Sequence, residues 1–262
     1  MASGIDSSKH PVVARTLAAI TLALPMAAAQ AADIQVLSGG AVRSVVAGLA
    51  SEFEKETGHV VHIAYAPMGV VRQRVAAGER ADVLILAAGV FDDLAKQGVL
   101  VADSRKDIAR VGVGVAVRQG APVPDISSTE AFKQALLAAP SIVYMDPGKG
   151  ATSGVHVANV LQRLGIADAV RDKTRLWPDG YAADSVAKGE SALAVQQISE
   201  LLPVKGVTFV GALPKELQMV SVYAAGTTSR STELEAARAF VAFVSRPEFQ
   251  ARFAKAGLDY RD

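Results

Sequence analysis

Short apolar runs that end at a turn marked by glycine or proline, and that are followed by helical spacing, recur along this chain. The run at residues 34–37 stops at the turn 38–40, after which apolar residues recur every three or four positions. Residues 142–145, the turn 146–154 and the helical pattern 155–164 repeat the same order. Repeated strand, turn and helix units are typical of parallel sheets covered by helices, so the sequence predicts an α/β fold.

Two longer segments depart from this alternation. Residues 109–117 form a valine-rich run that leads into a proline-containing loop instead of a helix, and residues 217–223 form a second long apolar run. We interpret both as strands at which the chain crosses from one part of the fold to another. A length of 262 residues is enough for one large or two modest globular units, which agrees with such crossings.

The composition excludes several kinds of function. The 27 basic and 26 acidic residues give a net charge of +1, so no overall field attracts nucleic acid or an anionic membrane. The absence of cysteine excludes disulfides, thiolate metal sites and a cysteine nucleophile. His59 and His62 lie three apart in a predicted strand and project to opposite faces, so they cannot chelate one metal ion. We therefore expect neither a metal nor an organic cofactor.

The first 31 residues have the pattern of a secretory signal. Basic residues precede an almost wholly apolar run at 16–29, and Ala29–Gln30–Ala31 is a small-x-small cleavage pattern. The apolar run is shorter than the about 20 residues that span a bilayer. We expect a signal peptide over residues 1–31, a periplasmic mature protein and no membrane anchor.

Four turns that precede predicted helices are candidates for ligand binding. In open α/β sheets, ligands bind beyond the carboxyl ends of the strands. The unsatisfied N–H groups and the dipole at a helix start attract anions. Four such starts in one cleft would hold a multiply charged anion although the chain is nearly neutral. The four turns are residues 38–40, 67–69, 149–154 and 178–181.

The order of several short motifs along the chain resembles that of the molybdate-type extracytoplasmic solute-binding proteins. The motifs are Ser38–Gly39–Gly40, Met68–Gly69, Ala81–Asp82–Val83, Asp146–Pro147 with Ser153–Gly154, Lys188–Gly189–Glu190 and the closing segment 236–258. The resemblance covers residues 32–262 and implies a two-lobed, type II periplasmic binding-protein fold with two crossing hinge strands. On this basis we place lobe I in residues 32–112 plus 222–262 and lobe II in residues 113–221.

The chain departs from the molybdate binders at positions that choose the ligand. Those proteins usually carry a serine pair before the first helix and a Gly-Ser-Ser-Gly turn before the second, whereas this chain has Ser38–Gly39 and Pro67–Met68–Gly69. Gln197 stands where the family usually has a tyrosine. A compact oxyanion requires short donors, whereas a longer polycarboxylate requires amides and cations. We therefore expect an organic tricarboxylate as the small-molecule ligand.

With this altered pocket, the chain is most similar to exported aconitate isomerases, which look like solute receptors recruited as enzymes. The resemblance implies that trans-aconitate and cis-aconitate are interconverted by an allylic proton shift without a cofactor. Such a reaction requires a base and stabilisation of dienolate charge, and the sequence leaves Lys149, His156 and Tyr181 open as candidate bases. The candidate substrate-binding residues are Ser38, Gly39, Gly40, Met68, Gly69, Arg72, Arg74, Thr152, Ser153, Gln196 and Gln197.

Two binding functions remain open on the residues alone. A receptor that delivers an organic polycarboxylate to an ABC permease would use the same cleft, and a molybdate or tungstate receptor would share the fold. Either would be expected to be a monomer. Arg72 and Arg74 lie two apart on a predicted helix, so at most one of them faces the cleft. In an alternative interpretation, Ser153 does not bind a ligand and only caps the N-terminus of its own helix.

Overall fold

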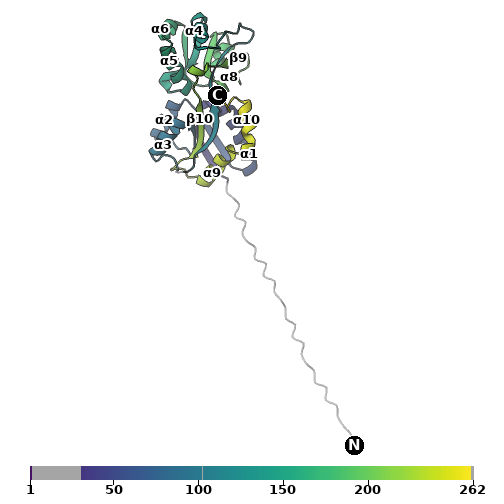
Figure 1. Cartoon of the computed structure of the whole chain (residues 1–262). Coiled ribbons are helices and arrows are strands. Elements are labelled where there is room, and N and C mark those ends of the chain that lie inside the picture. The colour runs from purple at the N-terminus through teal and green to yellow at the C-terminus, as the bar shows by residue number, and fades with distance from the viewer. Residues whose placement is uncertain (2–30, 102, 261–262) are drawn as a thin grey trace. The chain divides into compact units, whose positions relative to one another are not determined.

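Two five-stranded mixed sheets, each flanked by helices, form the computed structural model (Figure 1). The structure describes Met1, residues 31–101 and residues 103–260. Residues 31–262 form one unit. Apart from Met1 and Ala31, the predicted signal peptide lies outside the described residues.

The first sheet has the order β2-β1-β3-β10-β4, in which β1, β2 and β3 are parallel and β10 is antiparallel to β3 and β4. Its helices are the lower group in Figure 1. The strands are β1 (Asp33–Ser38), β2 (Val60–Tyr65), β3 (Val83–Ala87), β4 (Lys106–Val111) and β10 (Ser221–Thr227). The helical segments are η1 (Gly40–Val42), α1 (Arg43–Thr57), α2 (Met68–Ala76), α3 (Ala88–Lys96), α9 (Leu234–Val244), η5 (Pro247–Phe249) and α10 (Gln250–Lys255).

The second sheet has the order β7-β6-β8-β5-β9, with β6, β7 and β8 parallel and β5 antiparallel to its neighbours. The strands are β5 (Val113–Arg118), β6 (Ile142–Met145), β7 (Thr174–Trp177), β8 (Leu193–Gln197) and β9 (Val207–Ala212). The helical segments are α4 (Thr129–Ala138), η2 (Pro147–Lys149), α5 (Thr152–Arg163), α6 (Ala167–Val170), η3 (Arg171–Lys173), α7 (Ala183–Ala187), α8 (Ile198–Leu201) and η4 (Lys215–Leu217). The two sheets confirm the predicted α/β class.

The two predicted crossing strands differ from what the structure shows. Residues 109–117 are not one strand, because β4 ends at Val111 in the first sheet and β5 begins at Val113 in the second. A Cβ atom at the intervening Gly112 would lie 2.9 Å from the Tyr260 ring, so the close approach at this crossing requires glycine. The predicted strand 217–223 begins too early, because the 3-10 turn η4 precedes β10. The proposed lobe boundary 112/113 lies between β4 and β5, and the proposed boundary 221/222 lies after the first residue of β10.

Aromatic packing joins the beginning and the end of the chain in the first lobe. Phe53 of α1 lies with its ring centroid 5.3 Å from that of Phe240 and 5.4 Å from that of Phe243, both in α9. All three side chains are almost fully buried, and burying such a side chain contributes about 1.5–3 kcal/mol. Helices far apart in the sequence therefore stabilise one core beside β3, whose five residues are all buried.

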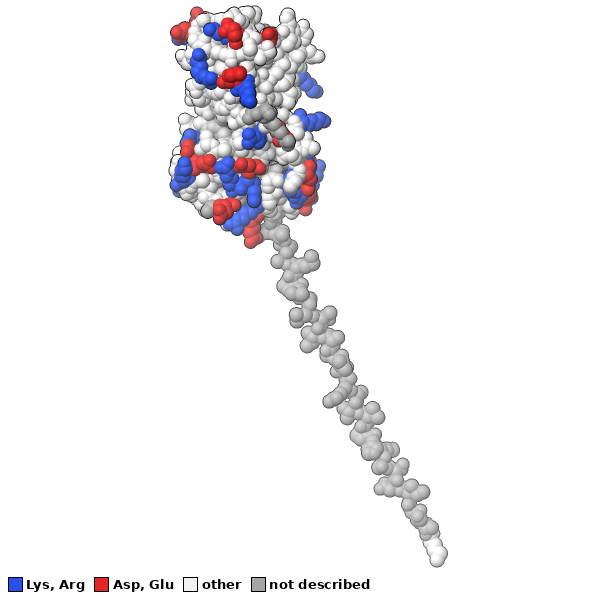
Figure 2. Space-filling model, in the orientation of Figure 1, with Lys and Arg blue, Asp and Glu red and all other residues white. Residues whose placement is uncertain are grey.

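Charged side chains of both signs are interspersed on the face shown in Figure 2. This distribution agrees with the net charge of +1 and leaves local geometry, not an overall field, to attract a charged ligand. Within the described ranges, no helix is long and apolar enough to cross a membrane.

Asp82 is predicted to be a main stabilising residue of the first lobe. Its side chain is fully buried and accepts hydrogen bonds of 2.8 Å from the Gln35 backbone N–H and from the Ser231 hydroxyl. Asp82→Ala leaves these donors unpaired, so we expect the free energy of unfolding to fall by about 2–4 kcal/mol. Urea unfolding measures this change.

The matched control is Asp168→Ala, because the exposed Asp168 carboxylate only pairs with Arg171 on the surface. It should cost less than about 1 kcal/mol. Equal effects of the two substitutions would contradict the role assigned to Asp82.

Candidate functional site

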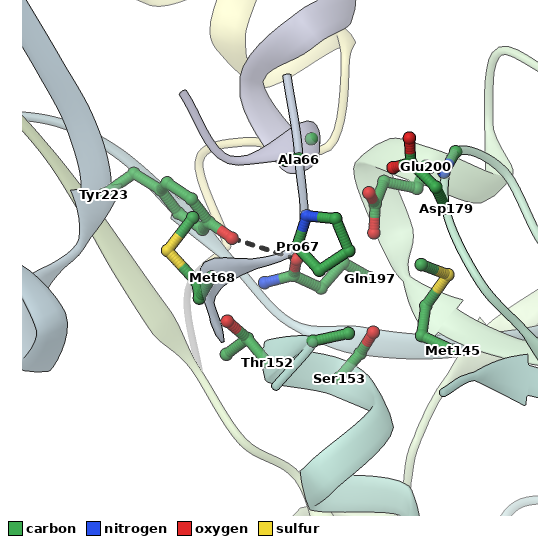
Figure 3. Close-up of a pocket in the computed structure, with 13 residues that line it drawn as sticks. Ala66, Pro67, Met68, Met145, Thr152, Ser153, Asp179, Gln197, Glu200 and Tyr223 are labelled. Atoms are coloured by element: carbon green, nitrogen blue, oxygen red, sulfur yellow. Dashed lines mark hydrogen bonds between the residues drawn. The ribbon is translucent and has the colours of Figure 1, made fainter. Parts of the chain in front are cut away.

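A pocket lies where the carboxyl ends of parallel strands from both sheets face each other (Figure 3). Its empty volume, including its opening to solvent, is about 350 Å³, of which only about 30 Å³ is open to the centre of a water-sized molecule, so the pocket is narrow in this conformation. Each of the four turns predicted from the sequence contributes to the wall. The lining residues are Gly40, Ala66, Pro67, Met68, Met145, Ala151, Thr152, Ser153, Asp179, Gly180, Gln197, Glu200 and Tyr223.

A buried carboxyl group, that of Glu200, forms part of the pocket wall. Glu200 lies in α8, directly after β8, and is only 6% exposed. Desolvation raises the pKa of Glu200 to about 8, against the smaller lowering effects of the Gln196 amide and the Arg43 charge. A Cβ atom at Gly40 would lie 2.7 Å from Glu200 Oε1, so the carboxyl packs where only glycine leaves room. The pocket thus contains an acid that can exchange a proton near neutral pH.

An amide with an unpaired donor lies in the same wall. Tyr223 Oη donates to Gln197 Oε1 at 3.2 Å, as the dashed line in Figure 3 shows. Gln197 is 3% exposed, and its Nε2 has no hydrogen-bond partner among the described residues. Burial raises the pKa of the Tyr223 phenol, which keeps it a donor. An acceptor atom of a ligand would provide the missing hydrogen-bond partner of Gln197 Nε2.

A guanidinium group lies between two tyrosine rings beside Glu200. Arg43, the first residue of α1, has its guanidinium carbon 4.6 Å from the ring centroid of Tyr65 and 5.9 Å from that of Tyr181. Burial raises the pKa of Tyr65 to about 12, and the Arg43 charge opposes that effect. Burial also raises the pKa of Tyr181, with a smaller contribution from the Glu200 charge. Both phenols are therefore neutral donors at neutral pH.

The two lobes touch at a pair of glycines. The Gly69 N–H donates to the Gly150 carbonyl at 3.3 Å. A Cβ atom at Gly69 would lie 2.6 Å from the Lys149 carbonyl oxygen, and one at Gly150 would lie 2.7 Å from Gly69 Cα. Gly150 also has φ +64°, a left-handed conformation that favours glycine. This contact is possible because neither residue has a side chain.

The predicted substrate-binding residues fall into four groups. Five of them line the pocket: Gly40, Met68, Thr152, Ser153 and Gln197. Three lie directly behind its wall: Ser38, Gly39 and Gln196. Gln196 accepts from the Ala182 N–H at 2.8 Å and donates to the Gly180 carbonyl at 3.0 Å, so it fixes the turn that carries Asp179 and Gly180. Gly69 forms the lobe contact described above.

The remaining two, Arg72 and Arg74, lie outside the pocket wall. The Arg72 guanidinium pairs with Asp93 at 2.6 Å, and Arg74 forms a bidentate pair with Glu79. Both pairs lie on lobe I. The short helix α2 buries Met68 and Val71, and Arg72 and Arg74 point toward acidic residues on the surface.

The three candidate bases lie in different surroundings. The Lys149 side chain is exposed, and this residue faces the other lobe with its backbone carbonyl. His156 Nε2 is 2.8 Å from the Leu217 carbonyl oxygen, and burial lowers the pKa of His156. None of the three candidate bases, Tyr181 included, lines the pocket. Tyr181 alone lies beside Arg43 and within electrostatic range of Glu200.

Sequence reasoning missed Glu200, Arg43, Tyr65 and Tyr223, and it included Asp179 only as part of the turn 178–181. A signal for Glu200 was present, because an acidic residue between Ile198 and Leu201, just after a buried strand, interrupts an apolar segment. The others carry no local signal, since arginine and tyrosine are ordinary at the start of a helix or the end of a strand. No group of three or more histidine or acidic side chains that could hold a metal occurs in the part of the chain that the structure describes.

Comparisons with known proteins connect this site to a family. Residues 34–259 match the family model described as bacterial extracellular solute-binding protein. The chain is 36% identical to an aconitate isomerase from a Pseudomonas species, over 92% of this chain and 94% of that protein. It is 31% identical to the molybdate-binding protein ModA of Azotobacter vinelandii, over 72% of this chain and 74% of that protein.

Solved structures show the same fold at lower sequence identity. The periplasmic molybdate-binding protein of Azotobacter vinelandii superposes with a TM-score of 0.73 at 21% identity, over 87% of this chain and 100% of that chain. Peb3 from Campylobacter jejuni superposes with a TM-score of 0.60 at 16% identity, over 87% and 100%. These similarities confirm the predicted two-lobed binding-protein fold.

Burial of Glu200 predicts a pH-dependent stability. Because the pKa of Glu200 rises from 4.5 to about 8 on folding, the folded state holds this proton more tightly. Stability is therefore lost as the pH rises from about 4.5 to about 8. Glu200→Gln removes this loss, so the variant should gain stability relative to the original chain with rising pH, by at most about 5 kcal/mol at about 1.4 kcal/mol for each pH unit.

Urea unfolding at pH 5 and pH 8 measures this difference. The control is Glu190→Gln, since Glu190 is a surface partner of Arg175 and should change stability by less than about 1 kcal/mol at either pH. A stability difference between Glu200→Gln and the original chain that does not grow with pH would show that the carboxyl ionises as it does in water.

The glycine contact predicts how the lobes close. Gly69→Ala places a methyl group against backbone atoms of the other lobe, which cannot move as a side chain can. We expect the lobes to separate, seen as an increase in the radius of gyration by small-angle X-ray scattering, while the free energy of unfolding stays within about 1 kcal/mol. Gly89→Ala is the control, because a Cβ atom there meets nothing within 4 Å. An unchanged radius for Gly69→Ala would contradict the steric argument.

Proposed function

The chain belongs to the bacterial extracellular solute-binding protein family, and we propose that its interlobe pocket binds trans-aconitate and cis-aconitate and interconverts them. The proposed reaction is a cofactor-free allylic proton shift in a periplasmic protein. Support comes first from the aconitate isomerase that is 36% identical over 92% of this chain. The pocket supplies the second support.

The observation that carries the proposal is the buried carboxyl of Glu200 in the pocket wall. A receptor that only binds a polyanion gains nothing from an ionisable carboxyl at its ligand, because the ionised form repels it. An enzyme that moves a proton between two carbon atoms requires such a group, with a pKa near the working pH. The pKa of Glu200, about 8, meets that requirement.

In the proposed reaction, one carboxyl group carries the proton. Glu200, as carboxylate, takes a proton from the methylene carbon of trans-aconitate, and the electron pair of that C–H bond enters the conjugated unit as a dienolate. The double bond moves by one position when Glu200 returns the proton to the former vinylic carbon. Bonds and charges balance, and no oxidant, reductant or cofactor is consumed.

The raised pKa of Glu200 allows the pocket both to bind an anionic substrate and to abstract a proton from it. With a pKa of about 8, roughly a tenth of the carboxyl groups are ionised at pH 7. The neutral majority does not repel an incoming tricarboxylate. The ionised fraction, poorly solvated, is a stronger base than a carboxylate in water. Neutral Tyr181, within electrostatic range of Glu200, is positioned near the reacting groups as a proton donor.

A second candidate function is a receptor that passes an organic polycarboxylate to an ABC permease. The family description favours it, because the family is named for solute binding. The same pocket would then close on its ligand without chemistry. A molybdate receptor, suggested by the Azotobacter relative, fits less well, because the turn Pro67–Met68–Gly69 lacks the serine hydroxyls usual in molybdate binders and Gln197 stands where they usually have a tyrosine.

The decisive experiment follows trans-aconitate by proton NMR with the purified protein and no added metal or cofactor. We expect cis-aconitate to appear. We expect Glu200→Gln to lower kcat by at least about 100-fold, because a positioned general base contributes about 10²- to 10⁴-fold. KM should change only a few-fold.

Glu190→Gln is the matched control and should keep full activity, since its side chain pairs with Arg175 at the surface. Substrate that binds to the folded protein and is recovered unchanged would refute the isomerase proposal in favour of the receptor. Conversion that survives in Glu200→Gln would refute the role of Glu200 alone.

A further inference from the structure

Beside the pocket, Arg43 has a buried hydrogen-bond donor that nothing in the described structure satisfies. Arg43 Nε is buried and has no partner. The structure also gives Arg43 no ion pair with any described acidic residue, in contrast to Arg72, Arg74 and Arg252, whose acidic partners lie on the surface. A guanidinium left in this state loses hydration without compensation.

Two more unpaired donors lie beside Arg43 or in the pocket wall. Tyr65 Oη is buried without a partner, and its ring lies under the Arg43 guanidinium at 4.6 Å. Gln197 Nε2, in the pocket wall, is also buried without a partner. A guanidinium, a neutral phenol and an amide nitrogen are all donors. The missing partner is therefore an acceptor, and the positive charge of Arg43 favours an anionic one.

The Arg43 cluster, made of Arg43, Tyr65 and Tyr181, adjoins the pocket. Tyr65 immediately precedes the lining residue Ala66, and Tyr181 immediately follows the lining residue Gly180. The charge of Arg43 acts on Glu200, itself a lining residue, although the two form no ion pair. None of the three side chains lines the pocket itself, so the cluster lies just beyond the wall, next to Ala66 and Gly180.

The geometry points to a carboxylate-binding subsite, and we propose that Arg43 and Tyr65 Oη together bind one carboxylate group of the substrate. Guanidinium and carboxylate form charge-assisted, often bidentate hydrogen bonds, and the Tyr65 hydroxyl adds a third donor. This inference rests on the proposed function for its substrate, a tricarboxylate. It adds the residue by which the site distinguishes a tricarboxylate from a dicarboxylate.

The subsite also affects the proton-carrying group. The Arg43 charge lowers the pKa of Glu200, which favours the carboxylate form that the reaction uses. The same guanidinium stabilises the dienolate charge that develops during the reaction. Because Tyr65 belongs to lobe I and Tyr181 follows the lobe II turn 178–180, both lobes contribute to this arrangement.

The test measures binding of tricarballylate, a saturated tricarboxylate that cannot isomerise, by isothermal titration calorimetry with the full chain. We expect Arg43→Gln to weaken binding about 10- to 100-fold, the effect of losing a hydrogen bond to a charged group. Tyr65→Phe should weaken it about 3- to 10-fold. The double variant should lose less than the product of the two single losses, because both residues hold the same carboxylate.

Specificity separates a binding role from a merely structural one. The original chain should prefer tricarballylate to glutarate, which lacks the central carboxylate, and Arg43→Gln should reduce that preference. Arg43→Lys, which keeps the charge without the planar fork, should bind at an intermediate level and serves if Arg43→Gln does not fold. Arg72→Gln is the matched control and should bind within about 2-fold of the original chain, because Arg72 lies outside the pocket wall and pairs with Asp93.

The outcomes distinguish this proposal from the proposed function. Tight tricarballylate binding that is lost in Arg43→Gln, in a protein that leaves trans-aconitate unchanged, would support the subsite and refute the isomerase. Unchanged tricarballylate affinity in folded Arg43→Gln would overturn the subsite, whether or not the protein isomerises aconitate. A protein that binds no tricarboxylate at all would overturn both.

Discussion

Desolvation of the Glu200 carboxyl is the constraint around which the pocket is organised. A carboxyl that is 6% exposed is costly to ionise, and the fold offsets this cost only in part, through the Gln196 amide and the more distant charge of Arg43. A full ion pair would hold Glu200 permanently ionised, and a fully apolar wall would hold it permanently neutral. The intermediate arrangement leaves a group whose proton is exchangeable near neutral pH.

The rest of the cleft supports this balance. Gly40 of lobe I has no side chain where the carboxyl of Glu200 of lobe II packs, and Gly69 and Gly150 let the two backbones come within hydrogen-bonding distance. The raised pKa of Glu200 therefore depends on closure of the lobes. If the lobes separate, Glu200 gains water and its pKa returns toward that of an ordinary carboxyl.

Prediction from the sequence was most successful where local rules decide structure. Turns such as 38–40 and 178–181 carry glycine between an apolar run and a helical pattern, and the topology of parallel strands then places them at one edge. Prediction failed where the structure depends on contacts between strands or side chains that are far apart in the sequence. The edge strand β9 has only half-buried residues, and the break between β4 and β5 at Gly112 depends on Tyr260. Arg72 was predicted to bind the ligand, but it pairs with Asp93. The sequence does not show which acidic residue lies next to an arginine in the fold.

The α/β class, the order of the strand and helix units and the four turns at the pocket can all be inferred from the sequence, because periodicity and glycine placement are local properties. Which side chains line the pocket depends on the tertiary fold. The pKa of Glu200 is raised because segments of both lobes bury its carboxyl, and Arg43 Nε has no partner because no described group lies in position to accept from it. Solvent exclusion and charge pairing depend on residues far apart in the sequence, so no local pattern could have shown them.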